Sequence, residues 1–344
     1  MLTERQLLVL NLIIKHYIEY GEPIGSKNLL KESKLPVSPA TIRNDMMKIE
    51  ELGFLEKTHS SSGRIPSNKG YRYYVDQLEE EKMNHSYLDI QKKIQSSIRM
   101  PYKEAQEIIE TSAEMLSYLT NYTALSIGPE TKNSRLTGFR IVPVTKGQYM
   151  AILVTDKGYV ENKIFTLANH IDSSQLEKIV NIFNEELVGV KLSEVYHKLQ
   201  NEIPIIIKKY VDSEIDLFGI FKEVISKMDS ERIYVGGGMN LLNYLESNES
   251  EKIKSIYSMI HQSKDLHTLL LSNQDDLTVR IGTEMNNELF NNFSMITATY
   301  EVGRNEKGLI ALLGPMNMPY HKIINIMRLT SNELSDSMHD FYKD

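Results

Sequence analysis

The segment SPATIRN, from Ser38 to Asn44, places hydroxyl, guanidinium and amide side chains at the start of a predicted helix. Serine suits the N-cap, and proline suits the first helical position, where its missing N–H costs nothing. Hydroxyl groups there act together with free backbone N–H groups and the positive end of the helix dipole, and this combination favours phosphate oxygens. A guanidinium and an amide further along have the shapes that pair with guanine and adenine edges. The candidate DNA contacts of this helix are Ser38, Ala40, Thr41, Arg43 and Asn44.

A basic hairpin is expected directly after this helix. The runs FLEKTH and RIPSNKGYRYYV flank the flexible tip SSSG and predict two strands. A helix beside a basic hairpin is typical of a winged helix, whose third helix enters the major groove while the hairpin follows the DNA backbone. Three alternatives stay open: a plain solvated face for the helix, an ordinary surface role for the hairpin histidine, and a winged helix that binds protein. The candidate contacts of this segment are Lys57, His59, Arg64, Lys69 and Arg72.

Three helices are predicted to position these side chains. The first begins after the N-cap candidate Thr3 and ends at Gly21, and the second is capped by Ser26. The third runs over 39–52, and Gly53 supplies the left-handed residue that ends it. Helical spacing gives the third helix one apolar stripe, which should face the core and consists of Ile42, Met46 and Ile49.

Length and charge are consistent with a small basic module attached to a larger acidic body. The chain has 344 residues, enough for two or three domains, and a net charge of −7. Residues 23–72 hold nine Lys or Arg against five Asp or Glu, so this segment carries +4 and the remainder −11. That asymmetry indicates a polyanion-binding module, although ordinary surface scatter is an alternative.

Several features point to the cytoplasm. No apolar run approaches the roughly 20 residues of a membrane helix. The N-terminal residues MLTERQLLVL lack the pattern of a signal peptide. The absence of cysteine fits a reducing compartment.

No constellation of catalytic or metal-binding residues stands out. The glycine cluster VGGGMN at 235–240 lacks the lysine and hydroxyl residue of a phosphate-binding loop, so a tight turn or close backbone packing is favoured. The nine histidines are scattered, and without cysteine a structural zinc site is disfavoured. Asp275 and Asp276 are adjacent and would point apart in a strand. The expectation is a non-enzymatic protein with no cofactor and no metal.

The rest of the chain predicts two further units. Residues 76–103 are expected to form a helical connector. Three strand-like runs over 135–166, joined by tight turns at 146–147 and 157–158, form a compact unit at 134–230. Helices follow the strands within this unit, the last over 216–228. This unit lies between the strand candidates YTALSIG and RIYVGGG, which could share a second sheet. The expected domains are 1–75, the connector 76–103, a split domain of 104–133 with 231–344, and the inserted unit 134–230.

The run SPATIRNDMMKIEELGFLEKTHSSSGRIPSNKGYRYYVD, residues 38–76, resembles the N-terminal signature of the HrcA-type heat-inducible transcription repressors. The motifs ATIRN, SSGRIPS and KGYRYYVD carry the resemblance together, and RIYVGGGMNLL and GLIALLGPMNMPY extend it toward the C-terminus. It implies a winged helix, a GAF-like domain, and a dimerising domain inserted into the latter. It also implies an inverted-repeat operator upstream of chaperone operons, release on heat stress, and support from a GroE-type chaperonin.

The expected fold class is therefore α+β multidomain: an N-terminal winged helix-turn-helix, and a GAF-like α/β domain with an inserted α+β dimerisation domain. The expected function is sequence-specific repression by a homodimer, because a two-fold protein matches an inverted repeat. The expected partners are double-stranded DNA, a second copy of the chain and, by resemblance, the chaperonin, with no membrane. The expected location is the bacterial cytoplasm, on the nucleoid when bound to DNA. The alternative is a ligand-gated winged-helix regulator that senses a small molecule through the GAF-like domain.

Overall fold

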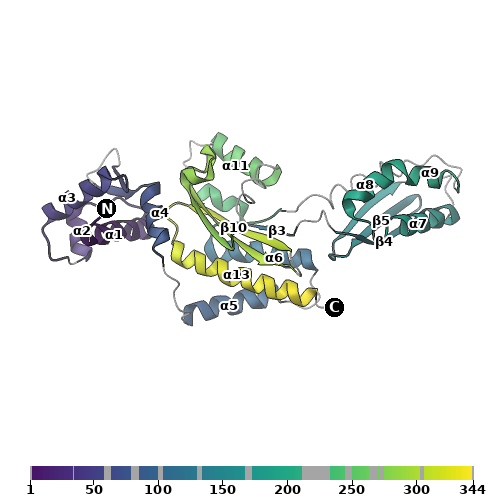
Figure 1. Cartoon of the computed structure of the whole chain (residues 1–344), viewed down its shortest axis with the longest axis horizontal. Helices are drawn as coiled ribbons and strands as arrows, with labels where there is room; N and C mark the ends of the chain where they lie inside the picture. Colours follow the sequence, from purple (N-terminus) through teal and green to yellow (C-terminus); the bar gives the residue numbers. More distant parts are fainter. Residues whose placement is uncertain are drawn as a thin grey trace.

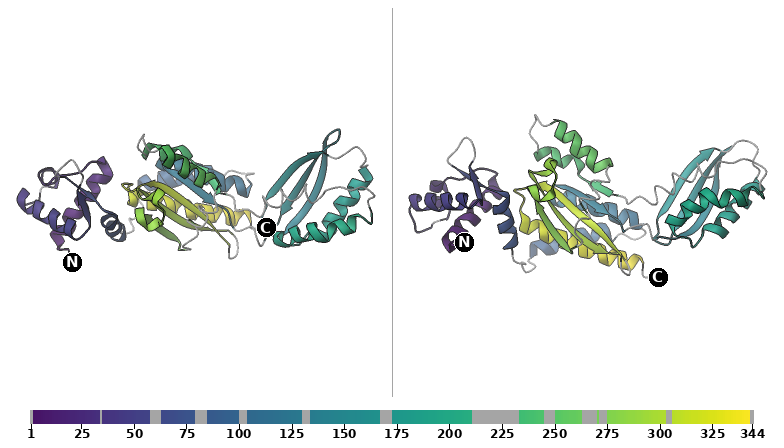
Figure 2. Two further views of the ribbon diagram at one scale, coloured as in Figure 1. Left: turned by 90° about the horizontal axis from the view of Figure 1, so that it is seen from above. Right: turned by 45° about the horizontal axis from the view of Figure 1, so that its top comes forward.

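Three units follow one another along an elongated molecule in the computed structural model (Figure 1). The two further views in Figure 2 show the same order, with the N-terminal unit at one end and the β4–β6 unit at the other. No helix among the described residues is long and apolar enough to cross a membrane. The structure describes residues 2–33, 35–57, 63–78, 85–99, 104–129, 134–166, 173–210, 233–244, 250–262, 270, 275–302 and 306–342.

The N-terminal unit contains three helices, a short hairpin and a fourth helix. As predicted, Thr3 caps the first helix, in a capping box with Gln6, and Gly21 ends it with a φ of 68°. The extended residue Ile24 exchanges backbone hydrogen bonds with Arg64, which adds a third, single-residue strand to the hairpin. The elements are α1 Glu4–Tyr20, α2 Ser26–Ser33, α3 Pro39–Glu51, β1 Leu55–Lys57, β2 Arg64–Pro66 and α4 Asn68–Asp76.

The second strand of the hairpin is shorter than predicted. β2 ends at Pro66, and the following NKGYRYYVD is helical because Ser67 accepts a hydrogen bond from the Gly70 amide and so caps α4. Tyr71 and Val75, one helical turn apart, are buried on the same side. Tyrosine has a high strand propensity, but the Ser67 cap and the helical spacing of Tyr71 and Val75 favour a helix here. The predicted tip SSSG spans 60–63, and residues 58–62 lie outside the described residues.

The central unit is built on a five-stranded antiparallel sheet with the strand order β7-β3-β10-β9-β8. The described helices α5, α6 and α13 lie along one face, and α11 lies on the other (Figures 1 and 2). The strands are β3 Thr123–Ile127, β7 Ile233–Gly236, β8 Leu277–Ile281, β9 Phe293–Glu301 and β10 Lys307–Pro315. The helices are α5 His85–Ile98, α6 Ala105–Thr120, η1 Gly238–Tyr244, α11 Ser250–Gln262, η2 Gly282–Met285, η3 Glu288–Phe290 and α13 Tyr320–Phe341.

Helix α5 departs from its predicted role as a connector. Its residues Ile94 and Ile98 are fully buried and belong to the same core as Ile326 and Leu334 of α13. Tyr87 of α5 also accepts a hydrogen bond from the Asn325 side chain at 3.1 Å. The helix is thus part of the wall of the central unit, because its apolar positions recur at helical spacing and find a partner there.

The third unit is a three-stranded antiparallel sheet with helices on one face (Figure 2). The predicted turns at 146–147 and 157–158 are confirmed, with φ of 83° at Gly147 and 71° at Gly158. The predicted helix over 216–228 lies outside the described residues. The elements are β4 Leu136–Thr145, β5 Gln148–Thr155, β6 Val160–Thr166, α7 Ser173–Leu187, α8 Leu192–Asn201 and α9 Ile203–Ile207.

The third unit is inserted in the sequence between β3 and β7, two neighbouring strands of the central sheet. Ile127, the last residue of β3, pairs with Ile233, the first of β7. The glycine cluster begins in the last two residues of β7, and its tight-packing interpretation is supported. A Cβ on Gly236 would overlap the Ala113 backbone, and Gly237 has a φ of 61°. Phosphate binding is not needed to explain these glycines.

Candidate nucleic-acid interface

The N-terminal end of α3 displays two hydroxyl groups. Ser38 caps the helix by accepting a hydrogen bond from the Thr41 amide at 3.1 Å. The two side-chain oxygens are also 2.9 Å apart, so one hydroxyl donates to the other and the second proton is left to donate outward. Ser38 is exposed and Thr41 half-buried. Backbone N–H groups and the helix dipole make this end suited to a phosphate oxygen.

Helix α3 has one buried face and one exposed face, as its sequence predicts. Ile42 and Ile49 are fully buried, and Met46 is 3% exposed. The opposite face carries Arg43 and Asn44, both exposed. The other exposed residues of that face are Ala40, Met47, Lys48 and Glu51. A small residue near the helix start and polar groups along the next turn suit close approach to a groove.

An ion pair with α1 fixes the angle of α3. The Arg5 Nε lies 2.7 Å from one Asp45 carboxylate oxygen, and Nη2 lies 3.2 Å from the other. Asp45 is almost fully buried among the apolar residues of the inner face. The hydrogen bond to Asp45 raises the pKa of the Arg5 guanidinium. A two-point contact restrains rotation of α3 about its own axis, which keeps its polar face outward.

Arg64 does not occupy the exposed position that was predicted for a phosphate contact. It is 6% exposed, and its Nε donates to Glu50 Oε2 at 2.7 Å. The bond ties β2 to the last turn of α3. The charge is neutralised inside the protein, so Arg64 supports the hairpin and is withdrawn from the set of candidate DNA contacts.

Lys57 and Lys69 are both exposed, in different settings. Lys57 is the last residue of β1 and pairs with Arg64, next to the tip of the hairpin. Lys69 donates to the Leu52 carbonyl at 2.9 Å and lies over the Phe54 ring at 4.4 Å from its centroid, so it caps the C-terminal end of α3. Its charge still faces solvent. His59 lies outside the described residues.

Arg72 is likewise removed from the DNA-facing set. Its Nε donates to Glu284 Oε1 at 2.8 Å, Nη2 bonds the other carboxylate oxygen, and Nη2 also donates to the Val279 carbonyl at 2.6 Å. The hydrogen bond to Glu284 raises the pKa of Arg72. Asn68 adds a bond to Thr283 at 3.1 Å. These contacts join α4 to the central unit, and we call them the seam.

The seam also has an apolar part. The rings of Tyr71 and Tyr320 lie 6.0 Å apart across it. Both side chains are fully buried and belong to one core that continues from the N-terminal unit into the central unit. The position of α3 relative to the central sheet is therefore set by α4.

Sequence patterns missed two kinds of residue. Lys48 follows Asn44 by one turn on the exposed face, and its helical spacing could have identified it. Asp45 and Glu50, which orient α3 through their arginine partners, carry no local signal of that role.

An exposed polar helix that follows two other helices and precedes a two-stranded hairpin defines a winged helix-turn-helix protein of the DNA-binding class. The DeoR-like helix-turn-helix domain model matches residues 33–67, and the model of the HrcA protein C terminal domain matches residues 106–324. The chain belongs to the HrcA family of heat-inducible transcription repressors.

Similar proteins cover the whole chain. Heat-inducible transcription repressor HrcA of Pediococcus pentosaceus is 43% identical over 100% of this chain and 99% of its own length. The protein of the same name from Enterococcus faecalis is 45% identical with the same coverage. A crystal structure of a hypothetical protein matches with a TM-score of 0.69, at 25% identity over 99% of both chains. Because the relatives are named transcription repressors, the prediction of a non-enzymatic regulator is confirmed.

Proposed function

We propose that two copies of this chain bind an inverted-repeat operator upstream of chaperone operons and are released on heat stress. The observation that carries this proposal is the outer face of α3, where Arg43 and Asn44 are exposed next to the hydroxyl groups of the helix start. A winged helix of this form places its third helix in the major groove. The heat-inducible character is taken from the names of the relatives.

The contacts are assigned by chemistry. Ser38 and Thr41 bind phosphate at the helix end, while Arg43 and Asn44 contact guanine and adenine edges. Ala40 permits close approach and packs against the groove. In and beside the hairpin, Lys57, His59 and, from the first turn of α4, Lys69 follow the phosphate backbone. Lys48 joins them as a cation on the same side of α3.

Dimerisation is assigned to the unit made of β4, β5 and β6, inserted into a GAF-like domain. Its inner sheet face packs on α7 through Phe139 and Phe183, whose rings stack at 4.7 Å. The outer face carries a cross-strand row of apolar residues, Val142, Met150 and Ile164, in register. Val142 is 42% exposed and Ile164 is 52% exposed. A contiguous apolar face on a sheet is suited to a symmetric contact with a second copy.

Release on heating requires an assembly that is only marginally stable near the upper growth temperature. A decrease of a few kcal/mol in its stability then dissociates the protein from the operator. A GroE-type chaperonin that maintains the active form is part of the proposal through the family resemblance. The protein acts in the bacterial cytoplasm, on the nucleoid.

Footprinting on chaperone-promoter DNA tests the operator proposal. We expect protection of two half-sites about one helical turn apart or a multiple of it, with affinity at least about 10³-fold above that for a scrambled duplex at the same salt concentration. A temperature ramp with and without chaperonin tests release. Equal affinity for the scrambled duplex would refute sequence-specific repression.

The substitution Ile164→Glu tests the dimer proposal. It places a charge on the outer sheet face, and we expect sedimentation equilibrium to show monomers at concentrations where the unaltered chain is a dimer. Ile205→Glu is the matched control, since Ile205 is 62% exposed on α9 and away from that face. A dimer that survives Ile164→Glu unchanged places the interface elsewhere.

A further inference from the structure

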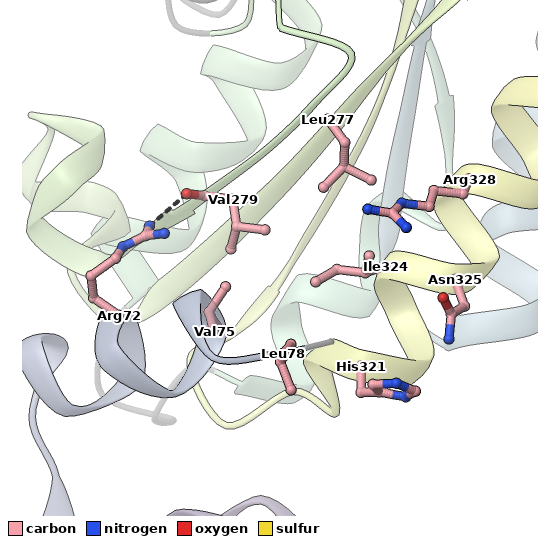
Figure 3. A pocket seen from close by; sticks show the side chains of 9 residues that line it. All are labelled: Arg72, Val75, Leu78, Leu277, Val279, His321, Ile324, Asn325 and Arg328. Atoms are coloured by element: carbon pink, nitrogen blue, oxygen red, sulfur yellow. Dashed lines mark hydrogen bonds between the residues drawn. The ribbon is translucent and has the colours of Figure 1, made fainter. Parts of the chain in front are cut away.

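A pocket of about 240 Å³ lies at the seam between α4 and the central unit. Figure 3 shows it from close by, with side chains converging from α4, from β8 and from α13. Its wall therefore comes from both units, and the pocket exists only while the seam is closed. Residues 321–328 of α13 form one side, and residues 72–78 form the other.

The polar part of the wall is cationic or neutral. Arg72, His321 and Arg328 line the pocket together with the amide of Asn325, and none of the nine described residues that line it is acidic. Arg72 uses its Nε, both Nη2 protons and one Nη1 proton in hydrogen bonds within the protein, which leaves one of its five N–H donors for another acceptor. The chemistry of this wall suits an acceptor-rich, negatively charged group.

The apolar part of the wall is also supplied from both sides. Val75 and Leu78 come from the α4 side, and Leu277, Val279 and Ile324 from the central unit. Aliphatic side chains beside a few convergent polar groups are the usual composition of a small-molecule site.

We propose that the seam pocket is a binding site for a small amphipathic anion, with a carboxylate or phosphate head and a short aliphatic body. Arg72 and Arg328 reach the pocket from opposite sides (Figure 3). The head lies on the Arg328 side, and the body lies against Leu277 and Ile324. The volume equals that of about eight water molecules, which matches a ligand with about eight non-hydrogen atoms, such as hexanoate.

The position of the pocket gives the ligand a regulatory effect. A ligand that touches both units binds the closed seam and not the open one, so it stabilises the closed arrangement by mass action. Because α4 sets the placement of α3, occupancy of the pocket restricts the positions that the recognition helix can adopt. This inference goes beyond the proposed repressor function.

The test is isothermal titration of the full-length protein with hexanoate and with hexyl phosphate, which separates the two head groups. We expect saturable 1:1 binding of at least one, no binding of neutral hexanamide, and much weaker binding of acetate. Arg328→Gln should weaken binding about tenfold by removing a charged donor. Ile324→Phe should weaken it as well by filling the space. Lys322→Gln, an exposed residue on the same helix outside the pocket, is the matched control and should leave binding unchanged.

Amide hydrogen exchange provides the second readout. At a ligand concentration of 100 times Kd, exchange of α4 amides through seam opening should slow about 100-fold. Absence of saturable binding, equal binding of hexanamide, or equal affinity in Arg328→Gln and Ile324→Phe would overturn the proposal. These experiments contain no DNA, so their failure leaves the operator proposal standing, and a failed footprint leaves this one standing.

Discussion

Replacing Arg64 by alanine distinguishes a cation that supports the fold from a cation that binds DNA. The Arg64 side chain is 7% exposed, and its Glu50 partner is 27% exposed. Both Nε and Nη2 lie 2.7 Å from Glu50 Oε2. The substitution therefore leaves a largely buried carboxylate without its guanidinium.

The expected cost follows from this burial. Removing one partner of a fully buried ion pair costs about 3–5 kcal/mol. Glu50 keeps partial contact with water, so we expect about 2–3 kcal/mol, a large share of the stability of a small domain. Native-state hydrogen exchange of the Ile24 and Ser67 amides, which donate to the Arg64 and Phe54 carbonyls, should accelerate about 30- to 150-fold.

The salt dependence of DNA binding is the paired measurement. Lys57→Ala, on the exposed end of β1, is the control and should lower the slope of log K against log salt by about one, with amide exchange unchanged. Arg64→Ala should leave the slope unchanged at temperatures where the unit remains folded. A reduced slope together with unchanged exchange in Arg64→Ala would refute the structural assignment.

Three further predictions concern the recognition helix, the seam and the core. Arg43→Ala and Asn44→Ala should each cost about 1–3 kcal/mol on the operator, measured as a lower ratio of specific to random binding; equal loss on both duplexes would indicate phosphate contacts alone. Glu284→Gln should weaken the seam by about 1 kcal/mol, seen as about fivefold faster exchange in α4; unchanged exchange would mean that the apolar contacts hold α4 alone. Burial raises the pKa of Tyr122 from 10.0 to about 12. The contribution of Tyr122 to the free energy of unfolding is therefore fully present below pH 10. It is lost as pH rises from 10 to about 12, because the unfolded chain releases this proton at a lower pH than the folded chain. Tyr122→Phe should make the alkaline loss of stability shallower in urea titrations; an unchanged pH dependence would contradict the assignment.

The recognition helix was predictable because its determinants are local. A serine cap, a proline at the first helical position and an apolar residue at each turn specify α3 within a few residues. The same holds for the tight turns at Gly147 and Gly158.

The fate of the arginines was not predictable from local patterns. Arg64 finds its partner 14 residues away and Arg72 finds its partner 212 residues away, so only the tertiary fold could show that both are paired with carboxylates. Local charge counts treat every basic residue as available at the surface. The fold uses Arg5, Arg64 and Arg72 to orient the reading surface, and leaves Arg43, Lys48 and Lys57 exposed.

The pairing of Ile127 with Ile233 makes the whole β4–β6 unit topologically equivalent to the loop of a hairpin. Each doubling of the length of this connection costs only about 0.6 kcal/mol of loop-closure free energy. The stability of the central sheet therefore depends little on the size of the unit inserted between β3 and β7. The β3–β7 junction is accordingly a natural grafting point. A fluorescent reporter domain that replaces the β4–β6 unit between these strands would leave the strand order of the central sheet unchanged.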